Sequence, residues 1–306
     1  MEFNEQDFRC GFCALIGKPN AGKSTFMNQI LGQKIAAVSP RPQTTRKRQL
    51  GIYSTDLLQI IFVDTPGVHL PKHKLGEFMM DVVQQALSEV DVILWMVDLS
   101  TLPEKEDTLI AEKLTAMRHS PPLLMVCNKT DTLPSDDRPQ RMLAYQAMAP
   151  KAKQISISAL RKDNFPALLE EITRRLPVGP PHFDPDQVTD LYVRDIASDL
   201  IREAALYHLK DEIPHSIAVR LDEFKERNEN LDYIAATILV ERESHKGIVI
   251  GKGGVMLKLI GQSARQQIEA MSGKKAYLEL RVKVNQDWMN NPSSLHWLGY
   301  NRKNIR

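Results

Sequence analysis

One octapeptide near the start constrains the fold more than any other part of this sequence: Gly17-Lys18-Pro19-Asn20-Ala21-Gly22-Lys23-Ser24. It fits the pattern G-x-x-x-x-G-K-[ST], with an apolar run before it and a helical pattern from Ser24 and Thr25 onward. Its glycines let successive backbone N–H groups face a phosphate, and the N-terminus of the helix adds partial positive charge. The pattern predicts that Lys23 reaches nucleotide phosphates and that Ser24 binds Mg²⁺, whereas a plain glycine-rich turn is the alternative.

Short apolar runs alternate with helical patterns through the first 175 residues or so. Near-continuous apolar strands that alternate with helices are typical of a doubly wound, mostly parallel sheet. The predicted class is therefore α/β, with a first domain at residues 1–176. The runs cover residues 13–16, 58–63, 92–97, 123–127 and 155–157, and the helical patterns lie at about 24–31, 76–90, 104–118, 138–149 and 165–175.

A segment with four prolines in nine residues, 177–185, ends this alternation. Because such a segment continues neither a helix nor a strand ladder, it is predicted to be a linker. Residues 186–306 then follow the order α-β-β-turn-α-β, which predicts a smaller α+β domain. Its charge is divided: residues 183–240 hold 6 Lys or Arg against 13 Asp or Glu, and residues 241–306 hold 12 against 5.

The tetrapeptide Asp64-Thr65-Pro66-Gly67 ends the apolar run that begins at Leu58. An Asp at the carboxyl end of a strand beside a phosphate loop can hold Mg²⁺ through water. Gly67 can offer its backbone N–H to a γ-phosphate, because no side chain intervenes. Alone, D-x-x-G is weak evidence for a nucleotide site, because it also occurs in surface turns. At the end of a strand that follows a phosphate loop, it becomes strong evidence for such a site.

The segment Asn128-Lys129-Thr130-Asp131 follows another buried run and indicates a purine site. The Asp131 carboxylate can accept hydrogen bonds from guanine N1–H and its amino group, whereas adenine would leave it unpaired. The stem of Lys129 can cover the base, and Asn128 can tie this loop to the phosphate loop. Ser158-Ala159-Leu160 is expected to offer a backbone N–H to guanine O6.

The second domain contains a glycine-rich turn, Gly251-Lys252-Gly253-Gly254, between two helical stretches. Glycines allow close approach to a sugar–phosphate backbone, and Lys252 can neutralise a phosphate. G-x-x-G alone is usually just a turn. Here Ile250 precedes it and its surroundings are basic, which favours an RNA-binding loop.

With these motifs in order, the chain resembles the TRAFAC-class GTPases and, within them, the Era family. The resemblance covers essentially the whole chain and rests on G-x-P-N-x-G-K-S, Gln43-Thr44-Thr45-Arg46, D-T-P-G, N-K-x-D, S-A-L and the second domain. It implies a GTPase domain followed by a type II KH domain. It also implies a switch segment at residues 33–50, whose Thr binds Mg²⁺ only in the GTP state. Thr45 is the expected ligand beside Ser24 and Asp64, with Thr44 close behind.

The resemblance further implies hydrolysis of GTP to GDP, with Lys23, Thr45, Gly67 and Asn20 in catalytic roles. Many small GTPases place a water-orienting Gln directly after D-x-x-G. Val68 occupies that position here and cannot orient water. Asn20 resembles an asparagine that helps related GTPases bind K⁺, and a loop-stabilising role is the open alternative.

The resemblance implies two partners, small-subunit (16S) ribosomal RNA near its 3′ end and the small ribosomal subunit, whose assembly the protein would assist. No DNA is expected. The alternative is a signalling GTPase at the cytoplasmic membrane surface or in cell-cycle control, with its second domain as an anchor, because anionic lipid also attracts basic segments. The near-balanced charge, 40 Lys or Arg against 38 Asp or Glu, excludes a histone-like polycation. An acidic, polar opening and three cysteines favour the cytoplasm.

Two further patterns are interpreted as structural. Cys10 and Cys13 form a C-x-x-C without a second Cys or His pair at zinc spacing. His69 and His73 are spaced i,i+4, but Pro71 lies between them and favours a mobile loop.

Overall fold

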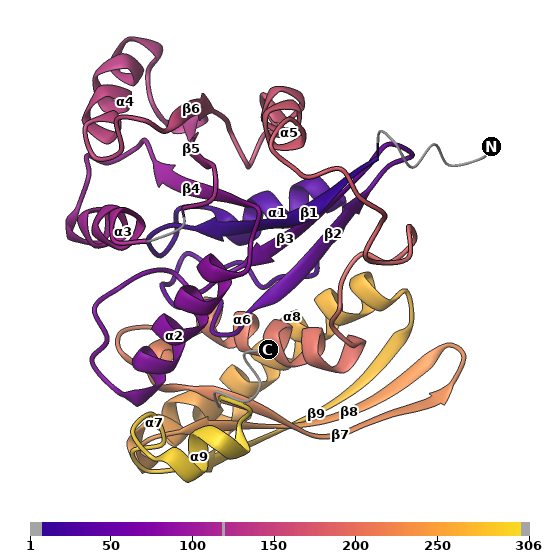
Figure 1. The fold of residues 1–306 in the computed structure, drawn as a ribbon. Coiled ribbons are helices and arrows are strands. Elements are labelled where there is room, and N and C mark those ends of the chain that lie inside the picture. The colour runs from indigo at the N-terminus through magenta and orange to yellow at the C-terminus, as the bar shows by residue number, and fades with distance from the viewer. Residues whose placement is uncertain (1–7, 118–119, 301–306) are drawn as a thin grey trace.

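The computed structural model describes residues 8–117 and 120–300, so the expectations for residues 1–7 and 301–306 lie outside the described residues. The first domain contains a six-stranded sheet in the order β2-β3-β1-β4-β5-β6 (Figure 1). Every neighbouring pair is parallel except β2 and β3, so the predicted doubly wound, mostly parallel sheet is confirmed. The strands are β1 (Arg9–Ile16), β2 (Gln49–Ser54), β3 (Leu58–Asp64), β4 (Val92–Asp98), β5 (Leu123–Asn128) and β6 (Lys153–Ser156).

Helices cover both faces of this sheet. Phe26 of α1 (Lys23–Leu31) and Leu168 of α5 (Phe165–Thr173) join the apolar cluster on one face. The other face is covered by α2 (Lys74–Ser88), α3 (Lys105–Thr115) and α4 (Arg138–Gln146). The inner strands β1, β3, β4 and β5 are therefore covered on both faces, which explains their largely apolar sequences.

Strand β2 is absent from the strands that the sequence predicts. It is the antiparallel edge of the sheet and pairs in the ladder only with β3. Gly51 stands in its middle because α1 packs closely there: an added Cβ would lie 2.8 Å from a Leu31 methyl carbon and 2.9 Å from the Met27 side chain. A central glycine weakens the alternating pattern by which a strand is found in a sequence.

The second domain has the predicted order of elements and a three-stranded sheet, β7-β8-β9. Strands β7 and β8 are antiparallel, whereas β8 and β9 are parallel. Figure 1 shows α6 and α8 between the two sheets of the molecule. The elements are α6 (Val193–His208), β7 (Ala218–Asn228), β8 (Leu231–Val240), α7 (Glu243–Ile250), α8 (Val255–Ser272), β9 (Lys275–Val284) and α9 (Pro292–Trp297).

The proline-rich segment lies against the edge of the first domain. The amide of the buried Gln59 side chain accepts hydrogen bonds from the backbone N–H groups of His182, at 2.8 Å, and Phe183, at 3.0 Å, and donates one to the Phe183 carbonyl at 2.9 Å. Farther along, the Ile52 N–H of β2 donates to the Val188 carbonyl at 2.8 Å. The exact domain boundaries remain predictions, but the segment between the sheets is held in place.

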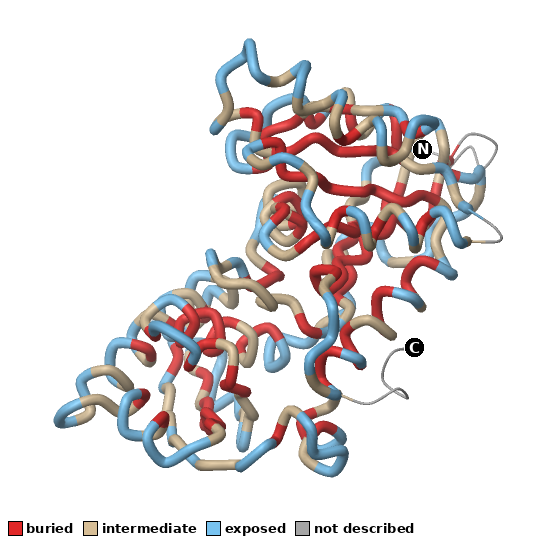
Figure 2. Tube along the Cα trace, turned by 90° about the vertical axis from the view of Figure 1, so that its left-hand side faces the viewer, coloured by how far each residue is buried: buried red, intermediate tan, exposed pale blue. Residues whose placement is uncertain are grey.

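The cores of the two domains are continuous. One apolar cluster runs from Phe26 and Ile35 in the first domain to Leu200 of α6 and Ile260 of α8. A second cluster joins α2 to the C-terminal part of the chain, where Phe78 and Met79 pack with the fully buried Trp288. Buried stretches of the chain are seen in both lobes of the molecule (Figure 2).

Candidate active site

The octapeptide forms a tight loop between β1 and α1, as its pattern predicts. Gly22 has φ 96°, and a Cβ at this position would lie 2.2 Å from Asn128 Nδ2. A Cβ on Gly17 would lie 2.5 Å from the Met96 carbonyl oxygen. Only glycine fits at both positions, because the loop approaches the ends of β4 and β5 so closely.

Lys23 begins α1, and its ammonium group lies under the loop. Its Nζ donates to the carbonyls of Gly17 and Lys18, both at 3.2 Å, and its side chain is buried. Burial lowers the pKa of the Lys23 ammonium to about 8, although the Asp64 charge opposes this shift. A polyanion at the loop would stabilise the charged form that burial disfavours.

The side chain of Lys18 turns away from this site, toward the start of α3. Its Nζ donates to Thr101 Oγ1 at 2.8 Å and Glu104 Oε2 at 2.7 Å, and it lies 3.2 Å from Asp107 Oδ2. Burial alone would lower the pKa of Lys18, but these two carboxylates raise it overall. Among the expected contacts, Lys18 can therefore face a nucleotide only through its backbone.

Three oxygen-bearing side chains meet beside Lys23. Ser24 Oγ donates to Asp64 Oδ2 at 2.7 Å, Thr45 Oγ1 donates to the same oxygen at 3.2 Å, and the two hydroxyls are 2.9 Å apart. Thr44 Oγ1 instead donates to the Arg41 carbonyl at 2.9 Å. The structure thus brings Thr45, rather than Thr44, to Ser24 and Asp64.

This oxygen group fits Mg²⁺. Asp64 is fully buried, and its Oδ1 has no hydrogen-bond partner among the described residues. Burial raises the pKa of the Asp64 carboxyl, even though Lys23 and the hydroxyls of Ser24 and Thr45 lower it. Hydroxyl and carboxylate oxygens are what Mg²⁺ prefers, and a cation here would satisfy the unpaired oxygen.

The D-T-P-G segment is fastened to the octapeptide. Thr65 Oγ1 donates to the Leu15 carbonyl at 2.7 Å, and the Val68 N–H donates to the Gly17 carbonyl at 3.0 Å. A Cβ on Gly67 would lie 2.7 Å from Pro19 N, so only glycine allows this approach. The Val68 side chain is fully buried in the apolar cluster under α2, which places it away from any attacking water.

Asn128, at the end of β5, links the predicted base loop to the octapeptide. Its Nδ2 donates to the Ala21 carbonyl at 2.8 Å, and its Oδ1 accepts from the Ala159 N–H at 2.9 Å. The tie to the phosphate loop that the sequence predicts is therefore present. A guanine O6 would share the Ala159 N–H with Asn128 or use the next amide, that of Leu160.

The remaining base-site residues converge at the ends of β4, β5 and β6. Asp131 Oδ1 accepts from Ser158 Oγ at 2.6 Å, and Ser158 is fully buried. Lys129 has φ 65°, and its Nζ pairs with Asp98 Oδ2 at 2.5 Å. Asp98 is the last residue of β4 and belongs to no motif, so the sequence analysis missed it.

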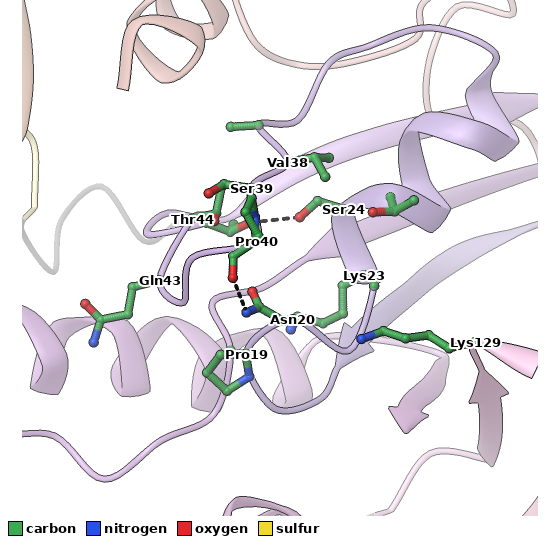
Figure 3. Close-up of a pocket in the computed structure, with 15 residues that line it drawn as sticks. Pro19, Asn20, Lys23, Ser24, Val38, Ser39, Pro40, Gln43, Thr44 and Lys129 are labelled. Carbon is green, nitrogen blue, oxygen red and sulfur yellow. Dashed lines mark hydrogen bonds between the residues drawn. The ribbon is translucent and has the colours of Figure 1, made fainter. Parts of the chain in front are cut away.

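A pocket of about 280 Å³ opens between the octapeptide and residues 37–45 of the expected switch segment (Figure 3). Asn20 lies at its mouth, where its Nδ2 donates to the Pro40 carbonyl at 2.8 Å. Lys23 and Ser24 at the start of α1 and Lys129 after β5 line this space. The pocket lies against the phosphate loop and contains Lys23, Ser24 and Thr45, as expected for a nucleotide and its metal ion.

Two charged residues of α6 hold the switch segment from the second domain. Arg202 is buried, and its guanidinium donates to the carbonyls of Gln43, at 3.2 Å, and Thr44. Glu203 accepts from the Val38 N–H at 2.9 Å and pairs with Lys34 at 2.6 Å. Nothing in the local sequence of α6 indicates these contacts, because their partners are about 160 positions away.

The turn at residues 251–254 joins α7 to α8, and its glycines have left-handed backbone angles: φ is 74° at Gly251, 63° at Gly253 and 80° at Gly254. Lys252 is exposed and Ile250 is half-buried. A groove of about 500 Å³ continues from Gly254 along α8 and β9. It carries the cations Lys258 and Arg265.

The cysteines of the C-x-x-C and the histidines spaced i,i+4 have different surroundings in the fold. The thiols of Cys10, Cys13 and Cys127 are free and buried. His73 caps α2, because its Nδ1 accepts from the Gly76 N–H at 3.0 Å. His69 Nδ1 lies 2.8 Å from the Gly67 carbonyl. No helix within residues 8–117 and 120–300 has the length and apolar character needed to cross a membrane.

Comparison with known families supports both domains. Residues 12–129 match a family described as "50S ribosome-binding GTPase", and residues 212–289 match the KH domain. The first match contains the octapeptide, D-T-P-G and the start of the base loop. The second contains the three-stranded sheet and the glycine-rich turn.

Similar proteins match over nearly the whole chain. GTPase Era of Geotalea uraniireducens is 44% identical over 97% of this chain and 99% of its own length, and GTPase Era of Alkaliphilus metalliredigens is 44% identical over 96% and 99%. A solved structure of Era with MgGDPNP and nucleotides 1506–1542 of 16S ribosomal RNA has a TM-score of 0.91 at 39% identity, covering 96% of this chain and 99% of that one. Era of Aquifex aeolicus bound to GDP and AlF4⁻ gives the same values. The chain therefore belongs to the Era family of GTPases.

Proposed function

We propose that this GTPase uses its nucleotide state to control binding to small-subunit ribosomal RNA near the 3′ end, and so assists assembly of the small ribosomal subunit. The observation that carries the proposal is the pair of sites in one continuous structure. A phosphate loop with its oxygen group lies in one domain, and a basic G-x-x-G groove lies in the other. Similarity to the Era complex with 16S ribosomal RNA supports the choice of RNA.

In this proposal the nucleotide lies in the pocket at residues 17–25, with guanine at Asp131. Ser24, Thr45 and Asp64 hold Mg²⁺, which when bound neutralises charge on the β- and γ-phosphate oxygens. Lys23 supports the phosphates from beneath the loop. The Asp131 carboxylate, now paired with the Ser158 hydroxyl at 2.6 Å, accepts from the guanine edge.

The chemical step is transfer of the γ-phosphoryl group to water, which depends on positioning and electrostatic stabilisation. Thr45 and the Gly67 N–H face the γ-phosphate end of the pocket. Since Val68 is buried, this chain places no side chain from that position beside the water. We propose that a K⁺ ion near Asn20 contributes positive charge, and that Asn20 exchanges its bond to Pro40 for this ion.

The G-x-x-G turn is proposed to clamp single-stranded RNA, with Lys252 against a phosphate and Ile250 against a base. The test replaces Lys252 and Gly253 together by Asp. A Cβ at Gly253 meets nothing within 4 Å, and Asp tolerates its left-handed angle, so the turn should still form. We expect loss of RNA binding with near-normal GTP affinity.

The matched control is Lys151→Asp with Gly273→Asp. Gly273 has φ 71° and equally open surroundings, so this pair has the same change in charge and the same backbone demand. The control should bind RNA as tightly as the parent. In both proteins this binding should weaken steeply as the salt concentration rises. If the Lys252 and Gly253 variant keeps its RNA but loses vesicles of anionic lipid, the membrane-surface alternative replaces this proposal.

A further inference from the structure

A cleft of about 460 Å³ lies between the two domains, at the β7 edge of the second sheet. Its walls come from the end of the switch segment, from α6, from β7 and from the C-terminal residues 297–300. The groove beside the G-x-x-G turn lies along β9, on the other side of β8. The cleft and that groove are thus separate.

The lining of this interdomain cleft is strongly cationic. Among its residues only Asp195 and Asp199 are acidic. Asp199 accepts from Gln49 and pairs with Arg202, whereas Asp195 is 3.9 Å from Arg194. The Lys and Arg residues of the lining are Arg46, Lys47, Arg48, Arg194, Arg202 and Arg220.

Four of the six cations have an acidic partner: Arg48 lies 3.7 Å from Glu89, Arg194 and Arg202 are near Asp195 and Asp199, and Arg220 pairs with Asp222. Arg46 and Lys47 have no acidic partner among the described residues, so the lining keeps a positive excess. Arg46 donates to the Ile217 carbonyl and Lys47 to the Leu298 carbonyl, and a carbonyl leaves the cation its full charge. The effect is seen at Tyr300: burial would raise the pKa of its hydroxyl, yet Arg46, Arg202 and Lys47 lower it overall. A recess with this potential attracts a polyanion.

An exposed aromatic ring stands at the edge of the same cleft. Trp297 is 51% exposed, whereas Trp95 and Trp288 are fully buried. The Arg220 guanidinium lies 4.0 Å from the centre of the Trp297 ring on one face. An indole beside cations is the arrangement on which nucleobases stack in proteins that bind single strands.

We propose that the interdomain cleft is a second binding site for single-stranded RNA, with phosphates against Lys47, Arg48 and Arg194 and a base against Trp297. This inference rests on the proposed RNA-binding function. RNA suits the cleft better than a lipid surface, since the cations line a recess between two domains and a base fills the space beside the ring. A strand bound here contacts residues 46–48, which directly follow Thr45.

Trp297 provides the direct measurement, because it is the one exposed Trp of the three in the chain. The full-length protein is titrated with a four-nucleotide RNA, enough for a G-x-x-G turn, and with one of about fifteen nucleotides. We expect only the longer RNA to quench Trp fluorescence and to protect it from acrylamide. Trp297→Phe should remove this signal while leaving a ring for stacking.

Affinity supplies the second measurement. Arg194 is 64% exposed in its side chain, so Arg194→Glu should fold normally. We expect Arg194→Glu and Trp297→Ala each to lower the affinity for the longer RNA about 5- to 100-fold, since stacking and phosphate contacts contribute affinity of this magnitude. The four-nucleotide RNA should bind as before. Lys151→Glu, an exposed charge reversal in the first domain, is the matched control.

The outcomes separate this inference from the proposed function. If the cleft variants bind the longer RNA as tightly as the parent and Trp297 is not quenched, the cleft is not an RNA site. The proposed function still stands in that case, provided that the Lys252 and Gly253 variant loses both RNAs. If anionic vesicles quench Trp297 and RNA does not, the site binds lipid and the inference is wrong.

Discussion

Arg202 offers a direct test of how the second domain acts on the nucleotide site. We expect Arg202→Met to raise the Mg²⁺ concentration that GTP binding requires while leaving GDP binding unchanged. Its guanidinium is buried and donates to the carbonyls of Gln43 and Thr44, the two residues before Thr45. Without it, residues 43–45 lose their anchor, and Thr45 leaves the oxygen group more readily.

The size of the effect follows from the bonds that are lost. A hydrogen bond from a charged donor contributes about 1.5–3 kcal/mol, and Arg202 makes two to the switch backbone. Even if half of this is recovered by water, about 1.5–3 kcal/mol remains, which corresponds to roughly 10- to 100-fold. The Mg²⁺ concentration for half-maximal binding and hydrolysis of GTP should rise by that factor. GDP is unaffected because the family's switch Thr is expected to bind Mg²⁺ only with GTP.

The assay measures the affinity of fluorescent GTP and GDP analogues at stepped Mg²⁺ concentrations, together with single-turnover hydrolysis. Arg281→Met, which removes an exposed cation from β9, is the control and should match the parent. Equal losses of affinity for GTP and GDP would mean that Arg202 stabilises the fold in general and not the GTP state. Parent-like Mg²⁺ dependence would refute the reasoning.

Three further predictions concern the nucleotide site. Asp131→Asn should lose at least about 100-fold in GTP affinity and gain affinity for xanthosine triphosphate, because a paired acceptor is lost; unchanged GTP binding would discard this base site. KCl should speed hydrolysis relative to NaCl, and Asn20→Ala should remove the difference; equal rates of the parent in both salts would exclude K⁺ from the mechanism. GTP affinity should fall up to about tenfold per pH unit above pH 8, because the free protein's Lys23, with a pKa of about 8, must then take up a proton to bind phosphate. Below pH 8, Lys23 is charged in both the free and the GTP-bound protein, so GTP affinity should no longer change with pH. Calorimetry in buffers of different ionisation heat measures the proton uptake. A GTP affinity that stays constant from pH 7 to 9 would contradict this role of Lys23.

The sequence was sufficient for five of the six strands of the first sheet and for the motifs at its edge. Each motif directly follows a buried apolar run, and parallel strands bring such ends to one edge, so the order of runs and motifs is enough to place Asp64 and Asn128 near Lys23. Strand β2 was not predicted, because Gly51 and the position of the strand at the edge of the sheet weaken its apolar pattern. The choice between Thr44 and Thr45 needed the backbone path of residues 41–45.

The contacts between domains could not be predicted in this way. Arg202 and Glu203 look like ordinary charged positions of an amphipathic helix, and their burial arises only when α6 meets the switch segment. The direction of the Lys18 side chain is a similar case, since its partners Thr101 and Glu104, just before α3, are more than 80 positions away. Long-range pairing of this kind leaves no periodic signal in either segment.

The attachment of the linker to the first domain limits how the second domain can move. The Asp190 carboxylate still accepts from the Leu50 N–H at 3.2 Å, and α6 begins at Val193. Three peptide units span at most about 11 Å, so the start of α6 stays close to β2 while this bond holds. If Arg202 loses its bonds to the switch segment, its guanidinium therefore remains at high effective concentration beside residues 43 and 44, and the bonds form again as an intramolecular event.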